Sequence, residues 1–265
     1  MNDPALGNAC AGFDAAVIDE LRAIAALHDE ANGLLLRLLG WAGSRVDSAL
    51  DRLPDGWRGR IDAAAGLALD HGYRIAFSTQ PGGDSRAVDR ALAWAAGERW
   101  HKAATAVTGA LGGAGGLATT LIDLPVTTTL ILRSIQQIAA GYGEDPADPA
   151  VRAQCVAVLG LGGPTPDDDA GDAGFVAARL ALSGKAITEV LKDVLPRFGI
   201  VVGQKALAQA TPLLGALAGA TINPVFTGYY QTMAHVHFRL RRLEAAHPPD
   251  QVRACFDRML AVGRG

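Results

Sequence analysis

The sequence predicts an all-α fold, a single multi-helix bundle-like domain, from three observations. Apolar residues recur at helical spacing along most of the 265 residues. Short turns that contain Pro and Gly, such as residues 53–57 (LPDGW), separate these stretches. The best strand-like run, residues 199–203 (GIVVG), has no alternating partner. We therefore expect one domain over residues 13–265, preceded by a tail at 1–12 and interrupted by an acidic loop at 162–174.

The first half of the chain predicts four helices. The first begins after Asp14, whose carboxylate can cap the first turn, and Val17, Leu21 and Ile24 then mark its apolar face. A second helical stretch over residues 34–53 has weak points at its glycines. A third, Ala-rich helix covers residues 58–77, and a fourth covers residues 85–100 after a polar turn.

Composition excludes several classes of function. A net charge of −3 without a Lys/Arg block gives no footprint for nucleic acid. Cys10, Cys155 and Cys255 are far apart and lack metal-ligand spacing, so we expect reduced cysteines, no bound metal and no cofactor. The acidic N-terminus has no apolar segment typical of a signal peptide, which predicts a cytoplasmic protein.

Two long runs, residues 103–122 and 206–238, contain no Asp, Glu, Lys or Arg. They open similarly, with GALGG at 109–113 and GALAG at 215–219, which suggests a duplicated two-helix unit. Small residues that recur every three or four positions let two helices approach closely. Such a pair forms either a buried hairpin or a hairpin that inserts into or docks on a membrane. The first run has 20 residues, enough to cross a bilayer, but Gly, Ala and Thr make it weakly hydrophobic. Both interpretations remain open.

Catalytic motifs are poor, so we expect no catalytic residues and favour a protein that is not an enzyme. The segment at 183–186 (SGKA) lacks the upstream glycine of a phosphate-binding loop. A GxGxxA pattern at 113–118 does not follow a predicted strand. His235 and His237 lie about 200° apart on a helix and cannot share a metal ion, and His237 lies on an apolar face where a core role is expected.

Polar residues recur at four-residue spacing on two predicted helices. The earlier helix follows Asp123 and Pro125, and two interpretations of Asp123 and Arg133 remain open. In the first, Asp123 caps this helix and Arg133 reaches solvent. In the second, the polar faces of the two predicted helices face each other and line a polar interior. The candidate residues for such an interior or ligand site are Asp123, Thr129, Arg133, Gln137, Asn223, Thr227, Gln231, His235 and His237.

Several stretches resemble the EcsC family over residues of about 40–253. They are LPDGW at 53–57, DLPVTTTLILRSIQQIA at 123–139 with GEDPADP after it, and PLLGALAGATINPVF followed by QTMAHVHFRLRRLE. The resemblance implies a bacterial, predominantly helical domain, linked by the family name to an operon that encodes an ABC transporter. It implies no activity.

Together these observations predict a non-catalytic accessory protein that is membrane-associated or linked to transport. It would be cytoplasmic, would attach peripherally to the inner membrane through its Gly/Ala-rich hairpins, and would have lipid or a membrane transporter complex as its partner. The alternative is a soluble helical enzyme or carrier that binds a small ligand between the helices at 125–140 and 224–244.

Overall fold

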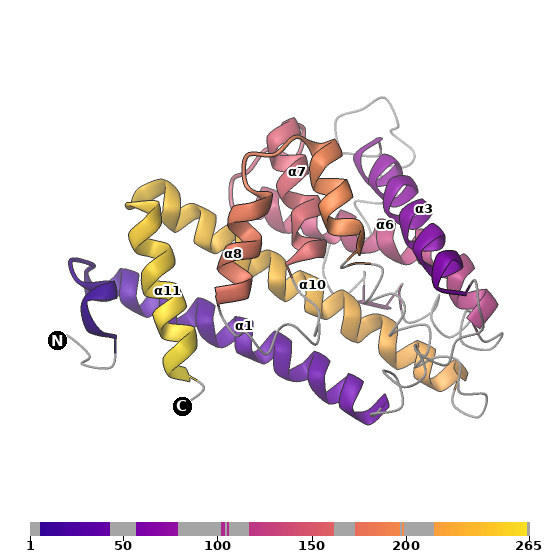
Figure 1. Ribbon diagram of the computed structural model, residues 1–265, viewed down its shortest axis with the longest axis horizontal. Coiled ribbons are helices and arrows are strands. Elements are labelled where there is room, and N and C mark those ends of the chain that lie inside the picture. The colour runs from indigo at the N-terminus through magenta and orange to yellow at the C-terminus, as the bar shows by residue number, and fades with distance from the viewer. Residues whose placement is uncertain are drawn as a thin grey trace.

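The structure, a computed structural model, describes residues 6–42, 57–78, 102–103, 105, 117–161, 173–196, 198 and 215–263. Most of these residues are helical, with no strand among them, which confirms the all-α prediction. Figure 1 shows the long helices α1, α6 and α10 with shorter helices packed around them. The elements in chain order are η1 (Gly7–Cys10), α1 (Ala15–Ala42), α3 (Trp57–Ser78), α6 (Leu117–Gly141), α7 (Pro149–Ala157), η2 (Val158–Gly160), α8 (Ala173–Leu182), α10 (Gly215–Ala246) and α11 (Pro249–Gly263).

Helix α1 begins where its capping residue predicts. The Asp14 carboxylate accepts a hydrogen bond from the backbone N–H of Val17 at 2.8 Å. The helix then continues through Gly33 to Ala42, so the predicted break near Gly33 is wrong. Packing of α1 along α10 offsets the cost of about 1 kcal/mol that a glycine adds inside a helix.

Helices α3, α6 and α10 run in the same direction. Ser134 contacts Gln231, and Glu144 contacts Arg241, so the α6 region and α10 meet in the same order along the sequence. A Cβ atom on Gly72 of α3 would come 2.9 Å from Thr128 Cγ2 of α6, and Ala76, further along α3, accepts a hydrogen bond from Arg133, further along α6. The N-terminal ends of these three helices therefore lie at one end of the molecule, on the right in Figure 1.

Two prolines lie inside helices instead of at their starts. Helix α6 begins at Leu117, so Asp123 and Pro125 are interior residues, and the predicted cap at Asp123 is wrong. Helix α10 likewise contains Pro224. An interior proline removes one backbone hydrogen bond and crowds the carbonyl four residues earlier, yet both helices continue through theirs, a cost that packing of the remaining turns can offset.

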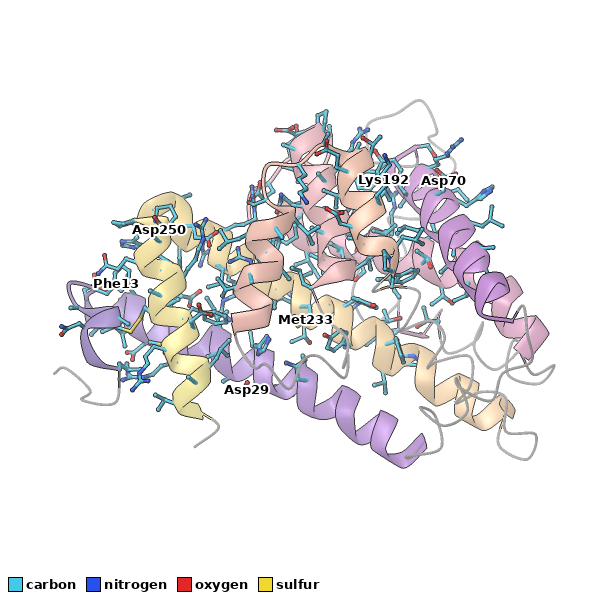
Figure 2. The ribbon with its side chains drawn as sticks, viewed as in Figure 1. Phe13, Asp29, Asp70, Lys192, Met233 and Asp250 are labelled. Atoms are coloured by element: carbon cyan, nitrogen blue, oxygen red, sulfur yellow. A yellow bond between two sulfur atoms is a disulfide. The ribbon has the colours of Figure 1, made fainter. Side chains whose placement is uncertain are left out.

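The N-terminal segment is fastened to the last helix. Cys10 and Cys255 form a disulfide, visible as a yellow bond beside α11 in Figure 2. Leu6 and Cys10 are buried, and the Gln251 amide donates to the Ala11 carbonyl. The expectation of three reduced cysteines is corrected for this pair, and the described part of the predicted tail, residues 6–12, packs against α11. The sequence did not predict this pair because its two cysteines are 245 residues apart.

Other sequence predictions lie outside the described residues. These are residues 43–53 of the second predicted helix, the helix at 85–100, most of the acidic loop at 162–174, the strand-like run at 199–203, and much of both uncharged runs, residues 106–116 and 206–214.

No helix in the described part of the chain is long and apolar enough to span a bilayer.

Candidate functional site

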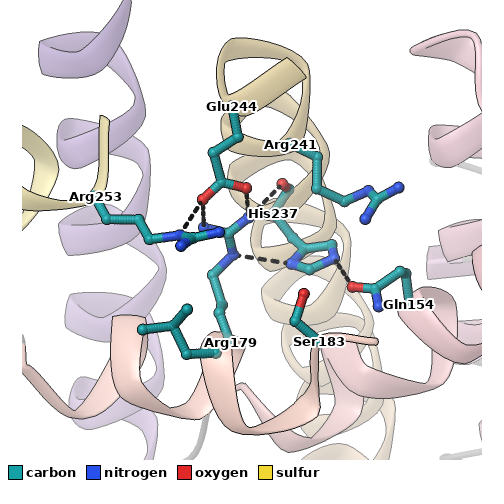
Figure 3. Close-up of a pocket in the computed structure, with 8 residues that line it drawn as sticks. Gln154, Arg179, Ser183, His237, Arg241, Glu244 and Arg253 are labelled. Carbon is teal, nitrogen blue, oxygen red and sulfur yellow. Dashed lines mark hydrogen bonds and ion pairs between the residues drawn. The ribbon is translucent and has the colours of Figure 1, made fainter. Parts of the chain in front are cut away.

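A small polar pocket of about 20 Å³ lies where α7, α8, α10 and α11 meet. This volume holds about one water molecule. Figure 3 shows the side chains around it, which converge from four separate segments of the chain. They are Gln154, Arg179, Leu180, Ser183, His237, Arg241, Glu244 and Arg253.

Arg179 of α8 is the centre of the polar network. It is only 7% exposed, which is unusual for a charged side chain. Its Nη1 and Nη2 donate to the two carboxylate oxygens of Glu244 at 3.0 and 3.1 Å, and its Nε donates to His237 Nδ1 at 3.1 Å. The paired charge and the matched fork geometry make burial of this guanidinium tolerable.

The contacts of His237 fix its protonation state. Nδ1 accepts a hydrogen bond from Arg179, whose Nε–H can only donate. The proton of the neutral ring therefore lies on Nε2, which donates to Gln154 Oε1 at 3.1 Å (Figure 3). Burial, together with the guanidinium groups of Arg179 and Arg241, lowers the pKa of His237 well below its ordinary value. His237 is thus a satisfied, neutral histidine in the core, as its apolar neighbours predicted.

The remaining charges around the pocket are also paired. Arg253 donates through Nε to Glu244 at 3.0 Å and through Nη1 to Asp250 at 3.1 Å. Arg241 turns toward Glu144, which it contacts at 2.8 and 3.3 Å. The three guanidinium groups thus face three carboxylates, and the network ties α8, α10 and α11 together.

Ser183 is the hydroxyl that borders this pocket. A serine nucleophile needs a base with a free lone pair within reach. The only unprotonated nitrogen of His237 is engaged by Arg179, so this histidine cannot take a proton from Ser183. The arrangement favours a structural network over a nucleophile and base.

Arg133, one of the sequence-predicted residues, lies in a different buried contact. It is 5% exposed and donates through Nη1 to the Ala76 carbonyl at 3.0 Å and to Gln136 Oε1 at 3.5 Å. Ala76 belongs to the last turn of α3, where backbone carbonyls lack partners within the helix. The interpretation in which Arg133 reaches solvent is therefore wrong. Asp123 lies about 15 Å away along the same helix, too far for direct pairing.

Three residues of the predicted α10 stripe contact other segments directly. Gln231 Nε2 donates to Ser134 Oγ at 2.7 Å, and Thr227 Oγ1 donates to Thr105 Oγ1 at 3.0 Å. His235 Nδ1 lies 2.8 Å from the Tyr142 hydroxyl. These contacts join helices, and they do not converge on one site.

The other candidates occupy separate positions. Thr129 donates to the Pro125 carbonyl of its own helix at 2.7 Å, and Gln137 is exposed. The side chains of Asp123 and Asn223 lie outside the described residues, although both residues belong to helices.

Comparison with known proteins gives the family. Residues 93–243, which are more than half of the chain, match the EcsC protein family. The chain belongs to the EcsC family. No curated protein and no solved structure matches it. The region that matches EcsC contains Arg179 and His237 and ends one residue before Glu244, while both disulfide cysteines lie outside it.

Sequence reasoning missed Arg179, Glu244 and Gln154 as partners of His237. One signal was present in the EcsC region, because α8 (AGFVAARLAL) carries Arg179 as its single charge. Phe175, Val176 and Leu182 place that charge on the apolar face, and a charge on such a face predicts a buried partner. The partner itself could not be named, since Glu244 is 65 residues away.

Proposed function

We propose that this protein is a non-catalytic accessory protein that docks on a lipid membrane through one end of its helical bundle. The uncharged end, as we call it, comprises residues 117–126 of α6, whose single charge is Asp123, and residues 215–226 of α10, which carry no charge. The observation that carries the proposal is the separation of charge along the molecule.

Helix α10 contains no charged residue from Gly215 to Phe238, and its first charge is Arg239. Helix α6 has only Asp123 before Arg133. Because α6 and α10 run in the same direction, their uncharged halves lie at the same end. The opposite end, where α11 lies on the left in Figure 1, holds ion pairs such as Glu20 with Arg239 and Asp250 with Arg253.

Two large apolar side chains are exposed near the uncharged end. Leu67 of α3 is 58% exposed and Val126 of α6 is 50% exposed. The contact of Gly72 with Thr128 sets the register of the two helices and places Leu67 level with Asp123 of α6, about one turn before Val126. A single exposed apolar residue is ordinary on a protein surface, but this pair lies beside the first halves of α6 and α10, which carry only one charge between them.

The alternative is a ligand carrier or enzyme with a site between residues 125–140 and 224–244. At this interface Gln231 bonds Ser134 directly, and His235 contacts Tyr142. Polar groups that are bonded to each other need no ligand, which favours the docking proposal.

The cytoplasmic location and the inner membrane remain predictions. The disulfide between Cys10 and Cys255 argues for an oxidising compartment, since cytosolic thiols are generally kept reduced. We therefore propose a lipid surface as the partner without assigning its side of the membrane.

Flotation with lipid vesicles tests the proposal. We expect the protein to float with vesicles, and Val126→Asp or Leu67→Asp to reduce the bound fraction several-fold because a charge resists transfer to the lipid interface. Val262→Asp is the matched control, since Val262 is 38% exposed on α11 at the opposite end. Absence of vesicle binding by the unmodified protein, or equal losses for Val126→Asp and Val262→Asp, would overturn the proposal.

A further inference from the structure

Helix α8 is held in place by one apolar face and one charged side chain. Phe175, Val176, Ala178 and Leu182 are buried, and the Phe175 ring lies 4.8 Å from the His28 ring and 6.0 Å from the Phe256 ring. Arg179 supplies the polar attachment, through its bonds to His237 and Glu244 of α10. The seating of α8 therefore rests in part on whether His237 can accept a hydrogen bond from Arg179.

The surroundings of His237 disfavour its protonation. Arg179 of α8 faces Nδ1 at 3.1 Å, and Gln154 of α7 occupies Nε2. From α10 itself, Arg241 and Glu244 border the same pocket, and Arg253 of α11 binds Glu244. Arg241 is paired with Glu144, which follows α6. A proton on Nδ1 would replace the bond to Arg179 with two donors and two positive charges in contact.

Glu244 remains paired if Arg179 leaves. Arg253 Nε donates to Glu244 Oε1 at 3.0 Å, independently of α8. Release of Arg179 therefore does not leave a buried carboxylate without a cation, the situation that makes breaking a buried ion pair most costly.

We propose that the contact between Arg179 and His237 is an acid-sensitive latch, which loosens α8 from α10 when the pH falls below the ordinary range of histidine titration. This proposal does not depend on membrane docking. The closed state holds His237 neutral, and only the open state can accept the proton.

The size of the effect follows from proton linkage. An exposed histidine titrates near pH 6.5, whereas burial and Arg179 hold the pKa of His237 well below this in the closed state. Above about pH 6.5 both states are neutral, so opening does not depend on pH. Below it the open state gains a proton, and its population rises up to tenfold per pH unit. Between pH 7.5 and 5.0 the opening constant should rise about thirty-fold.

Hydrogen exchange of the α8 amides, corrected for the intrinsic effect of pH, measures this opening constant. We expect the thirty-fold rise in α8 and less than a twofold rise in α3, which has no described contact with His237. His237→Gln should abolish the rise in α8, because a glutamine can accept from Arg179 and donate to Gln154 without titrating. His247→Gln is the control and should keep the rise, since His247 contacts Phe13 instead of α8.

Three results would overturn the latch. They are a flat α8 profile in the unmodified protein, an equal rise in α3 and α8, or an undiminished rise in a folded His237→Gln variant. The first two require no variant, so the proposal stays testable if His237→Gln fails to fold.

Discussion

Arg133 of α6 donates a hydrogen bond to the backbone carbonyl of Ala76, 57 residues earlier in the chain, at 3.0 Å. The contact places a cation at the C-terminal end of α3, where the helix dipole is negative and the last carbonyls need donors. The long uncharged run before Arg133 therefore ends at a buried charge that joins two helices.

Replacement of Arg133 should destabilise the protein. Arg133→Leu removes the donor to the Ala76 carbonyl, and we expect a loss of about 1–3 kcal/mol in the free energy of unfolding, measured with urea. Ala140→Gln is the control on the same helix, and because Ala140 is exposed its effect should stay within about 0.5 kcal/mol. Equal small effects for both variants would show that the Arg133 contact contributes little.

The pair Arg179 and Glu244 should contribute more than an exposed pair. Arg179→Met should cost about 3 kcal/mol, the lower end for breaking a buried pair, because Arg253 stays bound to Glu244. Lys185→Met breaks the partly exposed pair with Asp193 and should cost at most about 1 kcal/mol. Chemical denaturation of both variants measures the difference, and similar costs would contradict the buried role of Arg179.

Two glycines of α3 should respond oppositely to alanine. A Cβ on Gly72 would lie 2.9 Å from Thr128 Cγ2 and 3.2 Å from the Thr129 backbone nitrogen, so Gly72→Ala should cost about 1–3 kcal/mol. Among the described residues no atom lies within 4 Å of such a Cβ on Gly59, and Gly59→Ala should stabilise the protein by about 0.5–1 kcal/mol. Urea midpoints that shift in the same direction would contradict the close contact of α3 with α6.

The cysteines should differ in reactivity. A thiol reagent should find no accessible thiol in the native oxidised protein and one, Cys155, after denaturation, because Cys155 is fully buried and burial raises its pKa to about 12. Reduction, or Cys10→Ser, should lower stability by up to about 5 kcal/mol in the chain-entropy model, since the bond closes nearly the whole chain. Three reactive thiols after denaturation without reductant would contradict the disulfide.

Local sequence patterns predicted the helices. The polar contacts depend on how segments that are distant in the sequence pack together. The cap at Asp14 and the apolar positions of α1 follow from residues within a few turns, so sequence alone located the start of that helix. The position of His237 in the core could be predicted from Tyr230 and Met233, both of which are buried on the same helix. Its partners Gln154 and Arg179 could not, because they lie 83 and 58 residues away and depend on how the helices pack.

The prolines misled the prediction for a related reason. Pro125 and Pro224 look like helix starts in sequence, yet the preceding turns continue the helix in both cases. Local propensity favours a boundary at a proline, while packing of α6 and α10 against each other favours a continuous helix. The packing contribution is not visible in one sequence.

The most direct test of membrane docking is hydrogen exchange with and without lipid vesicles. Docking through the uncharged end predicts slower exchange at residues 117–126 and 215–226 when vesicles are present, with no change in α11 over residues 249–263. Unchanged exchange in both uncharged segments, or protection confined to α11, would contradict docking through this end.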